Sequence, residues 1–218
     1  MIRLSVAIMC HPSRLDLAHR LRRQLHNGRR TGTLIDIVQD PDPDGERNPW
    51  RTARLAWQRT PPACSHRLVL QEDVIPCPRF LYHARRALAA KPDRITSFFL
   101  GTNATVTWRQ MLIADAQGAH WVQGFANTWV PALALAIPSR LVASLADYDD
   151  GSRPVADDDV YGRWTREHGL PWYATIPSLV DHDDDAPSLM RNPYSTGARV
   201  AACPIGLTDP SLIDWTRD

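Results

Sequence analysis

The chain has 218 residues, of which 44% are hydrophobic, and its formal net charge is +1. This composition is ample for a well-packed core, and the near-zero charge weighs against a dedicated nucleic-acid or membrane-surface binder. The four cysteines lie far apart without C-x-x-C spacing, which predicts free thiols rather than a zinc site or a redox pair. The sequence has no secretory signal and no apolar run long enough to cross a bilayer, so we expect a cytoplasmic protein.

Strands and helices alternate in the first half of the chain. Short runs rich in aliphatic residues mark the strands, whereas Ala18, Leu21 and Leu25 recur at helical spacing. The predicted strands cover residues 3–11, 32–40 and 66–73, and the predicted helices cover residues 12–28, 49–60 and 78–92. This alternation is typical of an α/β domain with a Rossmann-type, mainly parallel sheet flanked by helices.

The second half is less regular. It predicts a strand at 94–101, a β-hairpin at 104–124, helices at 139–148 and 159–169, and an extended segment at 171–182. Aspartates are expected to cap the second of these helices, and Gly169 to end it. We expect one domain over residues 1–190, with residues 191–218 as a loop-rich tail that packs on it.

Polar residues follow three of the predicted strands. They are Cys10-His11, Gln39-Asp40 and Gln71-Glu72-Asp73. In open α/β sheets, ligands bind beyond the carboxyl ends of the strands. The adjacent carboxylates of Glu72 and Asp73 repel each other, and a divalent cation with oxygen ligands is a common way to relieve that repulsion. An ordinary turn explains Asp40 equally well.

A second acidic group lies downstream, in the run Asp157-Asp158-Asp159. The positive end of the helix dipole favours negative charge at this position, which explains one or two aspartates but does not require three. His182 ends another apolar run. A lone histidine in such a place is usually structural, but the acidic groups elsewhere in the chain make His182 a candidate ligand.

Four motifs together carry a resemblance to a known family. They are HPSR at 11–14, LVLQEDV at 68–74, DDDVYGRW at 157–164 and IPSLVDH at 176–182. In this order, they resemble the GT-A class of nucleotide-sugar glycosyltransferases. The similarity is greatest to small phage and bacterial members akin to the lipopolysaccharide-type transferases, and it spans roughly residues 4–190. It implies a GT-A-like fold and transfer of a sugar from a nucleotide-diphosphate sugar.

The resemblance assigns roles around the acidic motif, which the family writes as Glu-Asp-Asp. It implies that Asp73 binds a Mn²⁺ or Mg²⁺ ion at the donor diphosphate, and that His182 completes the metal shell. Glu72 would lie at the ribose or the metal. Gln71 occupies a donor-site position at which the family has an acidic residue. The missing carboxylate weakens the expectation that the enzyme depends on a metal.

The resemblance also assigns the rest of the donor site and the base. Asp40 matches the residue that reads the donor's base or ribose, while His11 and Arg14 border the nucleotide pocket. In inverting members, a carboxylate at the start of a helix removes the acceptor's proton. That position falls on Asp159, with Asp158 as the second choice.

The sequence does not decide the identity of the acceptor, and it leaves two alternative functions open. Trp129 is the preferred aromatic platform for an acceptor, which would be a glycan, a protein or a hydroxymethylated base in phage DNA. An arginine group at positions 20, 22, 23, 29 and 30 either grips phosphate or forms the solvated face of the first helix. The alternatives are a non-catalytic nucleotide-sugar-binding module, which Gln71 keeps open, and a nucleotidyltransferase. The expected Gly-rich or lysine-bearing phosphate loop of the latter is missing from the sequence.

Overall fold

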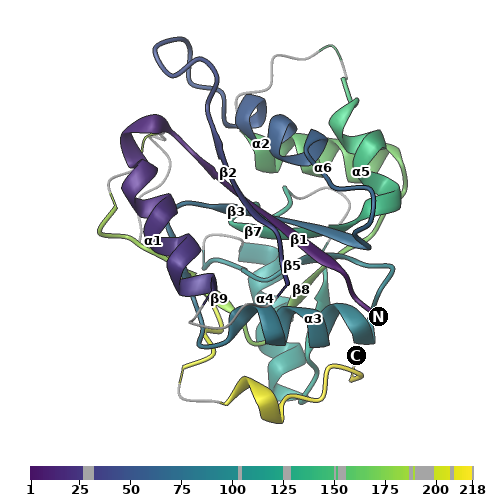
Figure 1. Cartoon of the computed structure of the whole chain (residues 1–218). Coiled ribbons are helices and arrows are strands. Elements are labelled where there is room, and N and C mark those ends of the chain that lie inside the picture. The colour runs from purple at the N-terminus through teal and green to yellow at the C-terminus, as the bar shows by residue number, and fades with distance from the viewer. Residues whose placement is uncertain are drawn as a thin grey trace.

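The computed structural model describes residues 1–26, 32–102, 105–124, 129–149, 151, 156–186, 189, 199–206 and 209–217, with residues 105–108 described for their backbone alone. These residues form a mixed α/β domain in which helices flank a seven-stranded sheet (Figure 1). The predicted α/β fold with a Rossmann-type, mainly parallel sheet is confirmed.

The strand order of the sheet is β2-β1-β3-β7-β5-β8-β6. The strands are β1 (Leu4–Cys10), β2 (Ile35–Gln39), β3 (His66–Gln71), β5 (Ile95–Ser97), β6 (Trp121–Gln123), β7 (Ala134–Pro138) and β8 (Trp172–Thr175). β1 pairs in parallel with β2 and β3, and β5 pairs in parallel with β8. β7 is antiparallel to both β3 and β5, and β6 is antiparallel to β8. All strands except β6 and β7 therefore point in one direction.

The register aligns the ends of the first three strands. Met9 of β1 lies beside Gln71 of β3, and Cys10 lies beside Gln39 of β2. The polar residues that follow these strands therefore gather at one edge of the sheet, as the sequence predicts for a parallel arrangement.

Helices cover both faces of the sheet. The short turn η1 (Pro12–Arg14), α1 (Leu15–His26) and α3 (Phe80–Ala90) belong to one face, and α2 (Pro49–Gln58), α5 (Ser139–Ala146) and α6 (Asp157–Glu167) to the other (Figure 1). Alternate side chains of β1 enter the two cores: Val6 and Ile8 pack toward α1, whereas Ala7 and Met9 pack toward α2. A strand buried on both sides is apolar without interruption, which explains the sequence of β1.

A second, two-stranded sheet continues from the end of β3. Its strands are β4 (Val74–Pro76) and β9 (Val180–His182), which pair antiparallel. Val74 lies opposite His182 in this ladder. The late histidine is thereby brought next to the strand-end carboxylates.

Two predictions of local structure are wrong, and one strand was not predicted. The segment predicted as a hairpin at 104–124 forms α4 (Thr105–Ala116) followed by β6. The adjacent apolar residues Met111, Leu112 and Ile113 read as a strand, but only Met111 is buried. The turn closes the helix, with Gly118 at φ +72°, instead of joining two strands. β7 was not predicted.

The second wrong prediction concerns the start of α6. Its N-cap is Ala156, which makes no side-chain cap, so the three aspartates form the first turn of the helix rather than cap it. The predicted end of this helix is confirmed by Gly169, which follows it at φ +61°.

The remaining predictions concern the end of the first helix, the tail and the bulk properties. The Asn27-Gly28 end and residues 191–198 lie outside the described residues, and the 1–190 boundary stays a prediction. In the described tail, which includes η2 (Pro210–Leu212), Trp215 is buried and its carbonyl accepts a hydrogen bond from Trp121 Nε1 at 2.8 Å. The four cysteines are free thiols, as predicted. Among the described helices, none combines the length and apolarity that crossing a membrane requires.

Candidate functional site

Two buried carboxylates and an arginine meet where β3 ends. Glu72 and Asp73 are 9% and 6% exposed. Arg14, in the turn after β1, donates from Nη1 to Glu72 Oε1 at 3.1 Å and to Asp73 Oδ2 at 3.3 Å. Charges this deep in a protein need a partner, and the guanidinium offsets the repulsion between the two carboxylates. The structure thus places three residues of the predicted donor site in direct contact.

His182 approaches the same carboxylate from β9. Its Nε2 lies 3.4 Å from Asp73 Oδ2, and its Nδ1 lies 3.1 Å from Asp184 Oδ1. The backbone amide of Asp183 donates to the carbonyl of Asp73 at 2.8 Å, which ties the two segments together. The sequence resemblance predicts that Asp73 and His182 bind the same metal ion. The pairing of β4 with β9 places their side chains close together.

The pKa shifts of the two carboxyls go in opposite directions. Burial raises the pKa of Asp73, but the hydrogen bond and charge of His182, followed by the charge of Arg14, outweigh burial and lower the pKa below its usual value. Burial, and then the charge of Asp73, raise the pKa of Glu72. Asp73 is therefore the carboxylate that keeps its negative charge most firmly.

These residues fit a divalent metal that takes further ligands from its substrate. In the described part of the chain, no three His, Cys, Asp or Glu side chains group closely enough to hold a metal by themselves. Mg²⁺ is usually held by one or two carboxylates together with substrate phosphates. Asp73 Oδ1 is buried and has no hydrogen-bond partner among the described residues, whereas His182 Nε2 lies 3.4 Å from the other oxygen of the same carboxylate. Asp73 Oδ1 is therefore available as a ligand, with the imidazole of His182 beside it.

Asp40 and His11 lie at the ends of β2 and β1. Arg51, from the first turn of α2, forms a bidentate ion pair with Asp40. Its Nε donates to Oδ1 at 2.8 Å, and its Nη2 donates to Oδ2 at 3.0 Å. Burial raises the pKa of Asp40, but Arg51 and other hydrogen bonds lower it overall, with a smaller contribution from the charge of His11. His11 Nε2 lies 3.3 Å from the carbonyl oxygen of Pro43. Sequence reasoning missed Arg51, because no local motif marks it.

Gln71 contacts the acidic turn of α6. Its side chain hydrogen-bonds to the carboxyl of Asp157, which is 4% exposed. Asp157 Oδ2 is buried and has no hydrogen-bond partner among the described residues. A glutamate at position 71 would place a second carboxylate against Asp157, whereas an amide can donate to it. This contact gives a physical reason for an amide rather than a carboxylate at position 71.

Burial controls the acidity of this turn. Burial, and then the charge of Asp158, raise the pKa of Asp157 to about 7. Burial, and then the charge of Asp159, raise the pKa of Asp158 to about 6. Tyr161, one turn later, is buried, and its hydroxyl accepts a hydrogen bond from Trp57 Nε1 at 2.9 Å. Two carboxyls that titrate near neutral pH are typical of a functional site.

Trp129 lies beside the same turn. The backbone amide of the next residue, Val130, donates to the carbonyl of Asp158 at 3.2 Å. The indole is partly exposed, whereas Asp159 is exposed outright. The segment before β7 therefore joins the predicted acceptor residue to the predicted base, although its role in binding stays a prediction.

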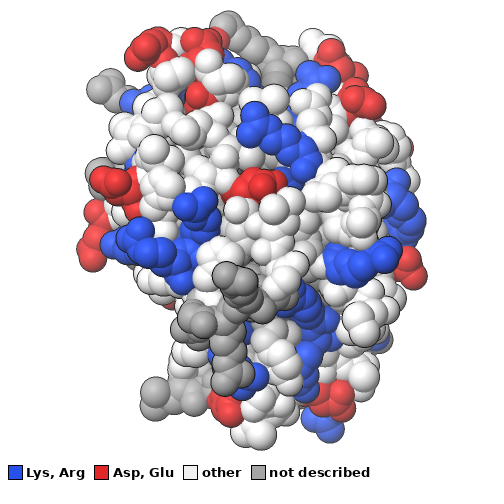
Figure 2. Space-filling view, viewed as in Figure 1, with Lys and Arg blue, Asp and Glu red and all other residues white. Residues whose placement is uncertain are grey.

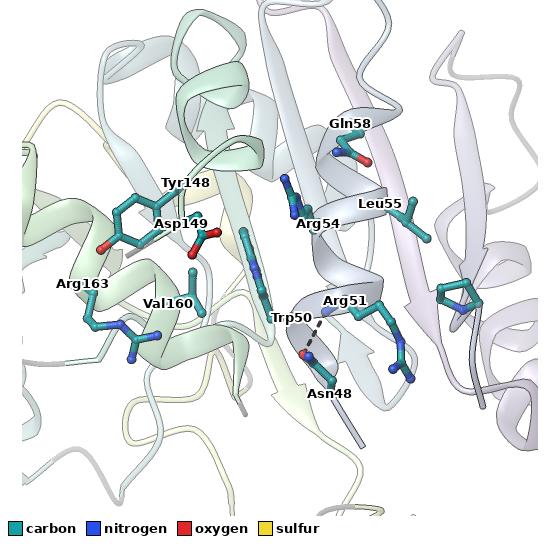
Figure 3. Close-up of a pocket in the computed structure, with 11 residues that line it drawn as sticks. Asn48, Trp50, Arg51, Arg54, Leu55, Gln58, Tyr148, Asp149, Val160 and Arg163 are labelled. Carbon is teal, nitrogen blue, oxygen red and sulfur yellow. Dashed lines mark hydrogen bonds between the residues drawn. The ribbon is translucent and has the colours of Figure 1, made fainter. Parts of the chain in front are cut away.

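Two described pockets adjoin these groups. A pocket of about 240 Å³ reaches Glu72 and is lined by Arg20, Leu21 and Asp183 among others. A larger one, of about 520 Å³, lies between α2 and α6 and does not reach Glu72 or Asp73 (Figure 3). Buried charges and unpaired ligand atoms indicate a reactive site more directly than pocket size does. The candidate site is therefore centred on Glu72 and Asp73.

The arginines of α1 were predicted either to grip phosphate or to form a solvated helix face. Arg20 is paired with Asp183 at 2.9 Å, and positions 29 and 30 lie outside the described residues. On the face shown in Figure 2, Lys and Arg side chains form separate groups with acidic and neutral surface between them. This distribution favours a solvated helix face.

Comparison with known proteins leaves the family open. No protein-family profile matches the chain, and no curated protein matches it. Among solved structures, the chain is similar to the inositol-1-phosphate CTP transferase from T. maritima, with 9% identity and a TM-score of 0.39 over 80% of this chain and 70% of that one. A likeness this distant carries no argument about function, which is therefore inferred from the site itself.

Proposed function

We propose that the protein is a metal-dependent glycosyltransferase that moves a sugar from a nucleotide-diphosphate sugar to an acceptor hydroxyl. The observation that carries the proposal is the buried Asp73, which stays ionised at the carboxyl edge of the sheet with one oxygen unpaired. A donor diphosphate and its cation would use that oxygen. The motif resemblance supports the same assignment.

In this proposal, different residues bind the metal, the diphosphate and the nucleoside of the donor. Asp73 and His182 hold the Mn²⁺ or Mg²⁺ ion, which when bound supplies a Lewis acid for the leaving diphosphate. Arg14, already between Glu72 and Asp73, stabilises negative charge as the diphosphate departs. His11 and Asp40 border the nucleoside, and Arg51 fixes the orientation of Asp40.

On the acceptor side, a carboxylate of α6 removes the proton. The acceptor oxygen forms a bond to the anomeric carbon, the carbon–oxygen bond to the diphosphate breaks with its electron pair leaving on the phosphate, and the hydroxyl proton passes to the base. We choose Asp158 as this base, because burial and the charge of Asp159 raise its pKa to about 6, near neutral pH, and its side chain is only partly exposed. A single displacement of this kind inverts the anomeric configuration.

The first test is donor binding. Thermal unfolding is followed with UDP-, GDP-, TDP- and CDP-sugars, each with and without Mn²⁺. A ligand at 100 times its Kd raises the free energy of unfolding by about 2.7 kcal/mol, which for a chain of this size raises Tm by about 5 °C or more. We expect that shift with one nucleotide, only when Mn²⁺ is present.

The matched variants are Asp73→Asn and Asp93→Asn. Asp93 is an exposed aspartate, paired with Arg140 on the surface, so its loss should leave donor binding unchanged. Asp73→Asn should abolish the metal-dependent shift. A shift that survives in Asp73→Asn, or the absence of any shift with all four donors, would contradict the proposed donor site. A donor that binds without transfer or hydrolysis would instead support a binding module.

A further inference from the structure

His182 stands between two carboxylates. Its Nε2 lies 3.4 Å from Asp73 Oδ2, and its Nδ1 lies 3.1 Å from Asp184 Oδ1. The imidazole is only 4% exposed, whereas the side chain of Asp184 is 35% exposed. Asp73 and His182 belong to the proposed metal site, but the proposed function assigns no role to Asp184. The second carboxylate therefore contacts the site from its outer side.

A neutral histidine that binds a metal through one ring nitrogen carries its proton on the other. That second nitrogen usually donates to a carboxylate, a backbone carbonyl or a water, which fixes the orientation and tautomer of the ring. Here Nε2 of His182 is the nitrogen on the side of Asp73, so Nδ1 would carry the proton. Both contacts of the ring are ion-pair distances without the alignment of hydrogen bonds. Asp184 lies within reach of the Nδ1 proton.

The tail of the chain holds Asp184 in place. Its Oδ1 and Oδ2 accept from the backbone amide of Arg199 at 3.2 Å and 3.0 Å. The side chain of Arg199 adds an ion pair, with Nε 3.7 Å from Oδ1. Hydrogen bonds of this kind restrict the rotation of a carboxylate, so that it presents its oxygens in a defined direction. Asp184 therefore has the support that a residue needs to orient a neighbour.

The same tail segment is anchored beside His182 at further points. Asp181 Oδ1 accepts from the backbone amide of His182 at 2.9 Å and from that of Ala201 at 2.8 Å. The amide of Ala202 donates to the carbonyl of Leu100 at 2.8 Å. These hydrogen bonds fix the tail against β9, next to the proposed metal site.

We propose that Asp184 is a positioning residue of the metal site, which accepts the Nδ1 proton of His182 and so holds Nε2 toward the ion beside Asp73. The tail contributes the backbone amide that holds Asp184. This inference rests on the proposed function, because that function assigns His182 to the metal. It adds that the tail supports the donor site and does more than pack on the domain.

Binding of Mn²⁺ tests the role of Asp184 without relying on activity. The whole protein is titrated with Mn²⁺, alone and with UDP, GDP, TDP or CDP, and the free ion is followed by its EPR signal. The same mixtures without protein are the reference. Removal of a group that orients a metal-binding histidine typically weakens metal binding about 10- to 100-fold. We expect a loss of that size in Asp184→Ala.

Two further variants separate orientation from charge. Asp185→Ala removes the same charge at the next position, an exposed aspartate of the same turn, and should leave Mn²⁺ affinity unchanged. Asp184→Asn keeps an oxygen that can accept the Nδ1 proton. It should bind Mn²⁺ more weakly than the wild type but more tightly than Asp184→Ala. Thermal unfolding of each variant without metal checks that the fold is intact.

Failure of this inference is distinguishable from failure of the proposed function. Wild-type affinity in Asp184→Ala, or an equal loss in Asp185→Ala, would overturn the role of Asp184 while the donor shift that depends on Asp73 remained. Equal affinities of Asp184→Asn and Asp184→Ala would also contradict it, because only the first can accept the Nδ1 proton. If the wild type binds no Mn²⁺ in any mixture, the proposed donor site itself is wrong, and this inference is wrong with it.

Discussion

Replacing Asp157 with asparagine should stabilise the protein at neutral and alkaline pH. The carboxyl is 4% exposed, one of its oxygens has no hydrogen-bond partner among the described residues, and Asp158 adjoins it in the chain. Ionising such a group in the folded state is costly. Asparagine has nearly the same shape, keeps an oxygen that can accept from Gln71, and carries no charge.

The magnitude follows from the raised pKa. In the unfolded chain the carboxyl titrates near 3.8, and in the folded chain its pKa is about 7. Between these values the folded state binds more protons than the unfolded state, so the stability contributed by this group falls as pH rises through that window. The full difference corresponds to about 4 kcal/mol above pH 7 and disappears below pH 4.

Urea unfolding at a series of pH values from 5 to 8 tests this reasoning. The advantage of Asp157→Asn over the wild type should increase by about 2.6 kcal/mol across that range. The urea m-value should be unchanged if the substitution leaves the fold intact. An advantage that is the same at pH 5 and pH 8 would refute the assignment of a raised pKa to Asp157. Asp149→Asn, at an exposed aspartate, is the matched control for the change from carboxylate to amide.

Two further substitutions test the packing of the site and of the sheet. Arg14→Gln leaves the buried Glu72 and Asp73 without their shared cation and should destabilise the fold by about 3 kcal/mol at pH 7 in urea unfolding; a loss under 1 kcal/mol would show that the carboxylates do not depend on Arg14. Gly124→Ala should cost about 3 kcal/mol in the same assay, because a Cβ there would overlap the indole of the buried Trp172; wild-type stability would mean that the ring can move aside.

The sequence predicted the parts of the site that depend on local pattern. The alternation of strands and helices placed His11, Asp40 and Asp73 at the ends of three strands, and parallel pairing aligned those ends. The acidic turn at Asp157 was also visible in the sequence. The segment at 104–124 was not predicted correctly, because its apolar residues follow no helical stripe and its turn residues are compatible with either a helix end or a hairpin.

The sequence by itself determined which residue types lie at the carboxyl edge of the sheet, since this depends on hydrophobic periodicity and turn chemistry along short stretches of chain. Only the tertiary structure decided their partners. Arg14 reaches Glu72 across 58 positions, and Gln71 contacts Asp157 through the packing of α6 against the sheet. Long-range packing also decided which aspartates are buried, and therefore which carboxyls titrate near neutral pH. Burial and charge pairing depend on distance in space, which no local pattern encodes.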